Sequence, residues 1–126
     1  MTDTFLLNDF YTVVSLEKPA ENKLLASIQL NVEHDIFKGH FEQMPVVPGV
    51  CQTQIIKEIL QEETGKNLTL TNGNNIKFTG MIIPTTHSKI QVELSYTVTG
   101  NQYVVDAQLF FENTIFTKFK GTFTAN

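Results

Sequence analysis

The sequence predicts an α+β domain in which a curved antiparallel sheet wraps around one long helix. Three observations support this fold class: apolar and polar residues alternate along most of the chain, turn signals separate the alternating runs, and a single segment has helical spacing instead. The chain has 126 residues, a length that suits one domain and leaves no room for a second of ordinary size. We therefore expect a single domain over residues 1–126.

The first part of the chain predicts a pair of antiparallel strands. Apolar side chains occupy the even positions from residue 24 to residue 32, which indicates a strand with one buried face. The run 10–16 is expected to pair with this strand through a turn at residues 19–22. The polar run 69–75 does not alternate in this way and is interpreted as a loop.

The C-terminal third predicts an antiparallel meander. Residues 90–98 and 103–111 both alternate, and the segment Thr99-Gly100-Asn101 between them is typical of a hairpin. A second turn at 112–114 leads into a further strand over 115–123. That strand is expected to place one set of side chains on one face (Ile115, Phe119 and Phe123) and the lysines on the other (Lys118 and Lys120).

Residues 48–64 form the one segment with helical spacing. Pro48 stands where a proline is tolerated at the start of a helix, and Gly65 is suited to the left-handed position that ends one. At about 1.5 Å per residue the helix would be roughly 24 Å long. Its apolar residues recur on one face and predict a buried stripe: Cys51, Ile55, Ile56, Ile59 and Leu60.

The charge and the cysteine content exclude several functional classes. Nine Lys plus Arg against thirteen Asp plus Glu give a net charge of −4, which argues against a general nucleic-acid binder because such proteins need a dense positive surface. The single cysteine, Cys51, excludes an intramolecular disulfide and a cysteine-rich zinc site. No basic leader and no apolar run long enough to span a bilayer is evident, so we expect a cytoplasmic protein.

Residues 31–50 contain the strongest indications of chemistry. This stretch holds two of the three histidines, two of the four prolines and two glycines. Unpaired N–H groups at a helix start near Pro48 and Gly49 could bind and polarise a carbonyl oxygen. A histidine on the preceding loop could take a proton beside that carbonyl, because its ordinary pKa of about 6.5 suits proton transfer near neutral pH.

The segment Gly39-His40-Phe41, followed by 45–50 (Pro-Val-Val-Pro-Gly-Val), resembles the signature of the 3-hydroxyacyl-[acyl-carrier-protein] dehydratases. These are hotdog-fold enzymes of fatty-acid synthesis, and weaker similarity extends along most of the chain, including Phe78, Pro84 and residues 118–121. The resemblance implies a hotdog fold without a cofactor. It further implies that His40 removes the α-proton of a 3-hydroxyacyl thioester while the N–H of Gly49 binds the thioester carbonyl. The neighbouring signature residues complete the implied substrate-binding set: Gly39, Phe41, Pro48 and Val50.

Position 54 departs from the family pattern. In the family, an acidic residue fourteen positions after the histidine helps to expel the hydroxyl as water, and it comes from the other subunit of a dimer; this chain has Gln54 there. An amide can orient a hydroxyl or a water molecule but has no proton to release near neutral pH. Two hypotheses follow: a weak dehydratase in which His40 makes both proton transfers, or a composite site in which a homologous partner supplies the acid. Glu42 and Gln43 also replace the proline and glycine of the signature.

Three further interpretations stay open. The first is a thioesterase on the same fold, which usually needs a helix carboxylate to activate water; Glu58 lies about one turn beyond Gln54. The second is an inactive acyl-binding subunit that works with a homologous partner. The third concerns the pathway, since the short, divergent form also resembles the dehydratases of aryl-polyene and related pigment pathways.

The expected partners are acyl-carrier protein and at least one further subunit, in a homodimer, a larger oligomer or a heterodimer with a homologous chain. A short chain that wraps one helix leaves little interior for an acyl group, so the acyl chain is expected to lie between subunits. Three lysines are candidates for the local basic patch that an acidic carrier needs: Lys38, Lys118 and Lys120.

Cys51, a possible metal site around His34, and His87 are also candidates for function. Cys51 could be a nucleophile in the first helical turn but is expected to be a small residue of the buried stripe. His34, Asp35 and His40 lack a recognisable metal-ligand spacing, so no metal site is predicted. His87 is expected to be a solvated loop residue.

Overall fold

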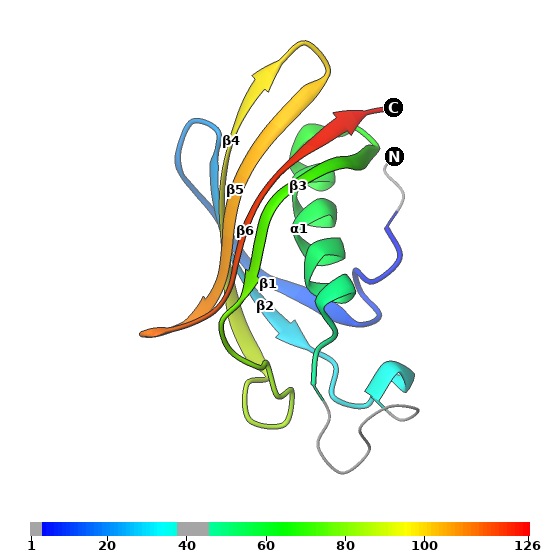
Figure 1. The fold of residues 1–126 in the computed structure, drawn as a ribbon. Coiled ribbons are helices and arrows are strands. Elements are labelled where there is room, and N and C mark those ends of the chain that lie inside the picture. The colour runs from blue at the N-terminus through cyan, green and yellow to red at the C-terminus, as the bar shows by residue number, and fades with distance from the viewer. Residues whose placement is uncertain (1–3, 38–45) are drawn as a thin grey trace.

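A curved six-stranded antiparallel sheet packs one face against a single long helix in the computed structural model, which describes residues 4–37 and 46–126 (Figure 1). The strands follow the order β1-β2-β4-β5-β6-β3 across the sheet. A short 3-10 helix, η1 (Asp35–Phe37), precedes the long helix α1 (Gly49–Thr64). The strands are β1 (Tyr11–Ala20), β2 (Lys23–Leu30), β3 (Leu68–Phe78), β4 (Lys89–Thr99), β5 (Gln102–Phe111) and β6 (Thr114–Ala125). The predicted α+β architecture is confirmed.

The N-terminal strand pair is confirmed, except that β2 ends at Leu30, so Val32, which was predicted on the buried face, lies outside the strand and is 38% exposed. β1 and β2 form a hairpin in which Tyr11 pairs with Leu30 and Ala20 pairs with Lys23. Asn22 has a φ of 60°, a conformation that asparagine tolerates in tight turns. The even-numbered apolar side chains of β2 are all buried in the core: Leu24, Ala26, Ile28 and Leu30.

The C-terminal meander is also confirmed, with one correction at the start of β6. Leu109 pairs with Thr117 whereas the next residue, Phe110, pairs with Ile115, so Phe116 is an extra residue in the strand. Such a bulge changes which side chains face the core. Phe116 is therefore buried while Ile115 is 37% exposed. The prediction that Ile115 shares the buried face of Phe119 is wrong for this reason.

The loop predicted over 69–75 is wrong, because those residues belong to β3. This strand pairs antiparallel with β6 and carries register shifts around Asn72. β3 lies at the edge of the sheet, and most of its side chains from Thr69 to Asn75 are exposed. Apolar alternation arises only where one face of a strand is buried, so an edge strand exposed on both faces lacks that pattern.

The helix has the predicted end and the predicted buried stripe, but it begins at Gly49, one residue after the predicted start, because Pro48 is extended. Gly65 adopts the left-handed conformation with a φ of 71°, and its N–H donates to the carbonyl of Gln61 at 2.8 Å. The five predicted stripe residues all lie in the core. Three polar side chains of α1 are buried as well, which the apolar pattern does not reveal: Gln52, Glu58 and Gln61. In the described ranges, no helix is long and apolar enough to cross a bilayer.

Gly121 allows β3 and β6 to approach closely. A Cβ atom at this position would lie 2.8 Å from the backbone oxygen of Asn72 and 2.8 Å from Cζ of Phe119. Gly121→Ala is therefore expected to lower the free energy of unfolding by about 1 to 3 kcal/mol, as overpacking does elsewhere. Urea unfolding measures this loss. The control is Gly80→Ala, whose new Cβ would have no neighbour nearer than 3.5 Å; equal losses in both variants would contradict the expectation.

Candidate functional site

The start of α1 borders an apolar hollow of about 230 Å³. The chain reaches it through Val47, whose N–H donates to the carbonyl of Ile82 at 2.9 Å. Pro48 is extended, with a φ of −62° and a ψ of 148°, and the helix begins at the next residue. The lining includes Val46, Pro48, Gly49, Phe78, Gly80 and Met81.

Gly49 brings the aromatic ring of Phe78 against the helix start. A Cβ atom on Gly49 would lie 2.7 Å from Cζ of Phe78, so glycine is the residue that permits this contact. Among the described residues, none accepts a hydrogen bond from the N–H of Gly49 or Val50. These donors carry the positive end of the helix dipole and can bind a carbonyl oxygen or an anion.

Three large apolar side chains surround this end of α1 and remain exposed: Val50 (77%), Phe78 (53%) and Met81 (58%). Such a cluster suits a ligand or a partner with an apolar surface. Of the predicted substrate-binding set, Pro48 and Gly49 line the hollow and Val50 follows them in the first turn of α1; their roles stay predictions. Phe78, known from the sequence only through the weaker similarity, lies directly against Gly49.

A buried amide fastens the first turn of α1 to the sheet. The Thr117 hydroxyl donates to Oε1 of Gln52, and Nε2 of Gln52 donates to the carbonyl of Val47 at 3.2 Å. Gln52 thus connects β6 to the segment that enters the helix. Sequence reasoning missed this residue; the available signal was a polar side chain directly beside Cys51 of the apolar stripe.

The predicted base lies outside the described residues. The same is true of its neighbours Gly39 and Phe41, and of Lys38. The roles assigned to His40, Gly39 and Phe41 therefore stay predictions.

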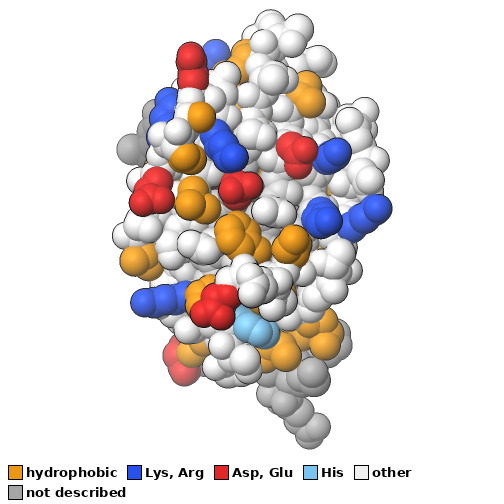
Figure 2. All heavy atoms as spheres, turned by 90° about the vertical axis from the view of Figure 1, so that its left-hand side faces the viewer, with side chains coloured by type: hydrophobic (Ala, Val, Ile, Leu, Met, Phe, Trp, Pro, Cys, Tyr) orange, Lys and Arg blue, Asp and Glu red, His pale blue; other side chains and the backbone are white. Residues whose placement is uncertain are grey.

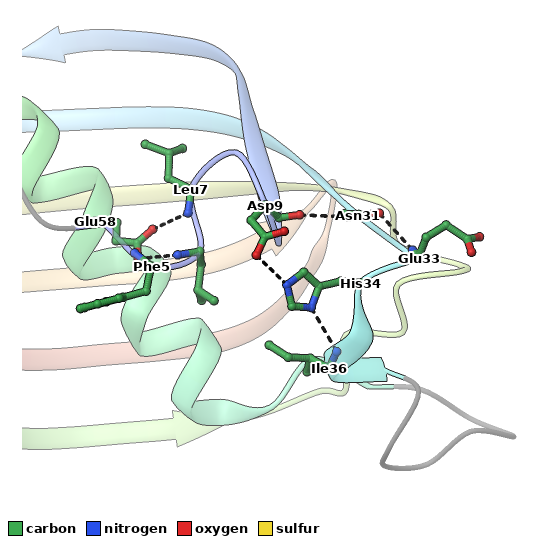
Figure 3. A network of polar contacts seen from close by, with 9 residues as sticks. Phe5, Leu7, Asp9, Asn31, Glu33, His34, Ile36 and Glu58 are labelled. Atoms are coloured by element: carbon green, nitrogen blue, oxygen red, sulfur yellow. Dashed lines mark hydrogen bonds and ion pairs between the residues drawn. The ribbon is translucent and has the colours of Figure 1, made fainter.

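Glu58 is a fully buried carboxylate in the middle of α1. Its Oε2 accepts hydrogen bonds from the N–H of Phe5 at 2.8 Å and of Leu6 at 3.0 Å. Its Oε1 accepts from the N–H of Leu7 at 2.8 Å and from the Tyr11 hydroxyl at 3.0 Å. Figure 3 shows the N-terminal segment lying along the helix at this point. Glu58 thus anchors the residues that lead into β1.

Gln54 lies one turn before Glu58 and is bound to it. The Gln54 amide nitrogen, Nε2, donates to Oε2 of Glu58 at 2.8 Å. Burial, followed by the nearby charge of Glu58, raises the pKa of Tyr11 far above its usual value, so the phenol stays protonated and continues to donate. Gln54, which the resemblance implies would orient the hydroxyl, is therefore held by Glu58, and other donors fix the Glu58 carboxylate in turn.

His34 has a structural environment. Its Nε2 lies 3.0 Å from Oδ2 of Asp9, and its Nδ1 accepts from the N–H of Ile36 at 3.1 Å (Figure 3). Its ring also packs edge-on against Phe10, with centroids 5.2 Å apart. Across residues 4–37 and 46–126, no group of three or more His, Cys, Asp or Glu side chains is arranged to hold a metal ion.

His87 lies in the predicted loop but is half-buried rather than solvated. Its Nδ1 accepts from the N–H of Ile83 at 3.1 Å, and its ring packs against Phe116 with centroids 4.9 Å apart. The burial of Phe116 by the bulge in β6 creates this contact, which periodicity alone does not indicate. His87 therefore stabilises a turn.

Two of the three predicted patch lysines lie on the outer face of the sheet. Lys118 is directly opposite Lys77 of β3, a residue that the sequence analysis did not name, and Lys120 follows on the same face. Nζ of Lys120 lies 3.9 Å from Oδ2 of Asp106, which partly offsets its charge. Figure 2 shows lysine side chains gathered toward one side of this face, with acidic and apolar side chains beside them.

Cys51 belongs to the buried stripe, as predicted, with 7% of its surface exposed. Burial raises the pKa of its thiol, which lowers the thiolate fraction that reacts. We expect iodoacetamide to alkylate the folded protein at least about tenfold more slowly than the urea-unfolded chain at neutral pH. Mass spectrometry over time measures both rates; equal rates would show a reactive thiol instead.

Comparisons with known proteins identify the family. The family model for ApeI-like dehydratases (ApeI dehydratase) matches residues 16–114. A curated relative, the 3-hydroxyacyl-[acyl-carrier-protein] dehydratase FabZ of Streptococcus sanguinis (strain SK36), is 32% identical over 72 residues. That match covers 52% of this chain and 51% of the relative, so the chain spans about half the length of the curated protein that it matches.

Solved structures share the fold. The dehydratase heterocomplex ApeI:P from Xenorhabdus doucetiae matches with a TM-score of 0.72 and 18% identity, covering 89% of this chain and 96% of that one. A hypothetical thioesterase from Streptococcus pneumoniae TIGR4, solved with coenzyme A, matches with a TM-score of 0.61 and 11% identity, covering 92% and 85%. These neighbours confirm the hotdog fold. With the match to the family model over residues 16–114, the chain belongs to the ApeI-like dehydratase family.

Proposed function

We propose that this chain is a dehydratase subunit that removes water from 3-hydroxyacyl thioesters carried on acyl-carrier protein. The observation that carries the proposal is the start of α1, where Gly49 lines an apolar hollow and the N–H groups of Gly49 and Val50 donate to no described residue. A thioester carbonyl bound there would be polarised, which makes a proton on the neighbouring α-carbon easier to remove. Membership of a dehydratase family supports this use of the site.

In the proposed reaction, His40 takes the α-proton, with Gly39 and Phe41 beside it in the chain. The electron pair of the broken C–H bond forms the new double bond between the α- and β-carbons, and the C–O bond at the β-carbon breaks. The hydroxide that leaves needs one proton to become water. His40 could return the proton it took, or an acid on another subunit could supply a proton.

The second subunit follows from Gln54, whose amide has no proton to release near neutral pH. We infer a site shared with a homologous partner that supplies the acid, while this chain supplies His40 and Gly49. The dehydratase heterocomplex from Xenorhabdus doucetiae, which has the same fold, supports an assembly of this kind. The exposed apolar side chains around the helix start, Val50, Phe78 and Met81, fit a site completed by a second chain.

Acyl-carrier protein is the second proposed partner, and the outer-face lysines are its proposed docking site. Lys77 directly precedes Phe78, whose ring contacts Gly49, and Lys118 directly follows Thr117, which bonds to Gln52. The lysines therefore lie at the same level of the sheet as the hollow but on its opposite face, so the carrier's acyl arm would have to reach the hollow around the edge strand β3. Because the chain has a net charge of −4, attraction would depend on this local patch.

Hydrolysis of the thioester is the competing function, since the same fold occurs in a hypothetical thioesterase. A hydrolase on this helix would need a carboxylate that can activate water. Glu58 has no exposed surface, and both of its oxygens accept hydrogen bonds from protein donors. This observation favours dehydration over a hydrolysis that uses Glu58.

The proposed base is tested by His40→Ala. Removing a general base typically lowers the rate by about 10² to 10⁴, and we expect a loss of this size with a 3-hydroxyacyl-carrier substrate, measured by mass spectrometry of the carrier-bound product. The assay uses the protein alone and with a homologous subunit. His87→Asn is the control, because an asparagine oxygen can still accept from Ile83. An unchanged rate in His40→Ala would refute the role, and acyl release without dehydration would favour the thioesterase.

The missing acid is tested by Gln54→Glu. The new carboxyl would lie beside Glu58, and two carboxylates at hydrogen-bond distance cannot both ionise easily, so one keeps a proton near neutral pH. We expect the isolated chain to gain about 10²-fold in dehydration rate. The same variant should gain little when a partner already supplies the acid. Gln54→Leu is the matched control; an equal response of the two variants would argue against a missing acid.

A further inference from the structure

We propose that Glu58 is a positioning residue for Gln54: it binds the amide nitrogen and leaves the amide oxygen as the group that Gln54 presents to a ligand. This inference rests on the proposed function and adds a selectivity to it. The chain would favour acyl groups that carry a hydroxyl at the β-carbon over those that carry a ketone.

The first step is the set of donors around Glu58. Five hydrogen bonds of 2.8 to 3.0 Å reach its two oxygens from described residues. Three come from backbone N–H groups and one from the phenol of Tyr11, which stays protonated. A backbone N–H can only donate, and Oε2 of Glu58 accepts from two of them. Glu58 therefore offers an acceptor to the Gln54 side chain.

The second step is the orientation of the Gln54 amide. An amide has a donor end and an acceptor end of nearly the same size, and its orientation follows from its hydrogen-bond partners. Turning the amide over would set its oxygen 2.8 Å from a carboxylate oxygen, with no hydrogen between them. The spacing of four residues along α1 holds the two side chains on one helix face. Gln54 is thus fixed with its nitrogen toward Glu58.

The third step is the consequence for a ligand. Gln54 is half-buried, and no described residue donates a hydrogen bond to its amide oxygen. A β-hydroxyl can donate to that oxygen, whereas a β-ketone offers only another acceptor and a saturated carbon offers nothing. A site that binds a hydroxyl in this way rejects analogues that lack it, because a polar group is left unpaired. Gln54 would therefore hold the leaving hydroxyl without protonating it.

The test measures binding, so that it is independent of turnover. The ligands are pantetheine amides with equal acyl chains carrying a β-hydroxyl, a β-ketone or neither; the amide replaces the thioester and prevents reaction. Isothermal titration with the full chain, without the partner whose acid would also bind the hydroxyl, gives each Kd. We expect the hydroxyl ligand to bind about tenfold more tightly than the ketone, equivalent to about 1.4 kcal/mol, and the saturated ligand to bind with intermediate strength.

Three variants separate positioning from simple stability. Glu58→Ala removes the acceptor that holds the Gln54 nitrogen, so the Gln54 amide can turn over and the hydroxyl-to-ketone ratio should fall close to one. Gln54→Leu should abolish the ratio in a protein whose Glu58 is intact, which keeps the test valid if Glu58→Ala fails to fold. Tyr11→Phe removes a different hydrogen bond to Glu58 and should keep the ratio.

The outcomes are distinct. A wild-type ratio in Gln54→Leu, or in folded Glu58→Ala, would overturn the inference, as would equal binding of the hydroxyl and ketone ligands by the unaltered protein. Failure of the proposed function looks different: the hydroxyl preference and its dependence on Gln54 would persist, while the dehydration assay with His40 intact would give no product.

Discussion

The buried carboxylate of Glu58 is the interaction on which much of this structure depends. A charged group without exposed surface is tolerated only when its oxygens are hydrogen-bonded. The donors come from the N-terminal segment, from Tyr11 at the start of β1 and from Gln54 on the same helix. One side chain thereby fixes the entry into the sheet, the position of the helix and the orientation of the residue beside the proposed chemistry.

The other two buried polar residues of α1 make similar connections at its ends. Gln52 joins the first turn to β6 and to the segment before the helix. Gln61 joins the last turn to β3, because its Oε1 accepts from the N–H of Leu68 at 2.9 Å. Apolar packing alone would let a helix slide or rotate against a sheet, since it is not directional. These three polar contacts fix its register, and with it the place where Gly49 meets Phe78.

Most of the fold could be predicted from the sequence, because most strands have one buried and one exposed face. β2, β4 and β5 show this in their alternating side chains, and α1 shows it in its apolar stripe. β3 could not be predicted, because most of its side chains at the sheet edge are polar and exposed on both faces, so apolar and polar residues do not alternate along it. The position of Ile115 could not be predicted either, since the bulge depends on pairing with β5.

The candidate site was predicted less completely than the fold. Residues 48–50 follow from the helix start and the family signature, and the structure places Pro48 and Gly49 in the lining of a hollow. Four of the five donors to Glu58 lie about fifty residues away in the sequence, so these contacts are purely tertiary. The position of Glu58 among apolar helix residues was the sequence signal for its burial, but no local pattern predicts which residues donate hydrogen bonds to it.

The anchoring of residues 5–7 also bears on how the protein moves. Chain ends usually open locally at little cost in free energy, and their amide hydrogens exchange with solvent quickly. Here, opening the N-terminal segment would take three donors away from a carboxylate inside the protein. That penalty couples the fraying of the segment to the loosening of α1. We therefore expect the amides of Phe5, Leu6 and Leu7 to exchange slowly, together with the cooperative part of the molecule.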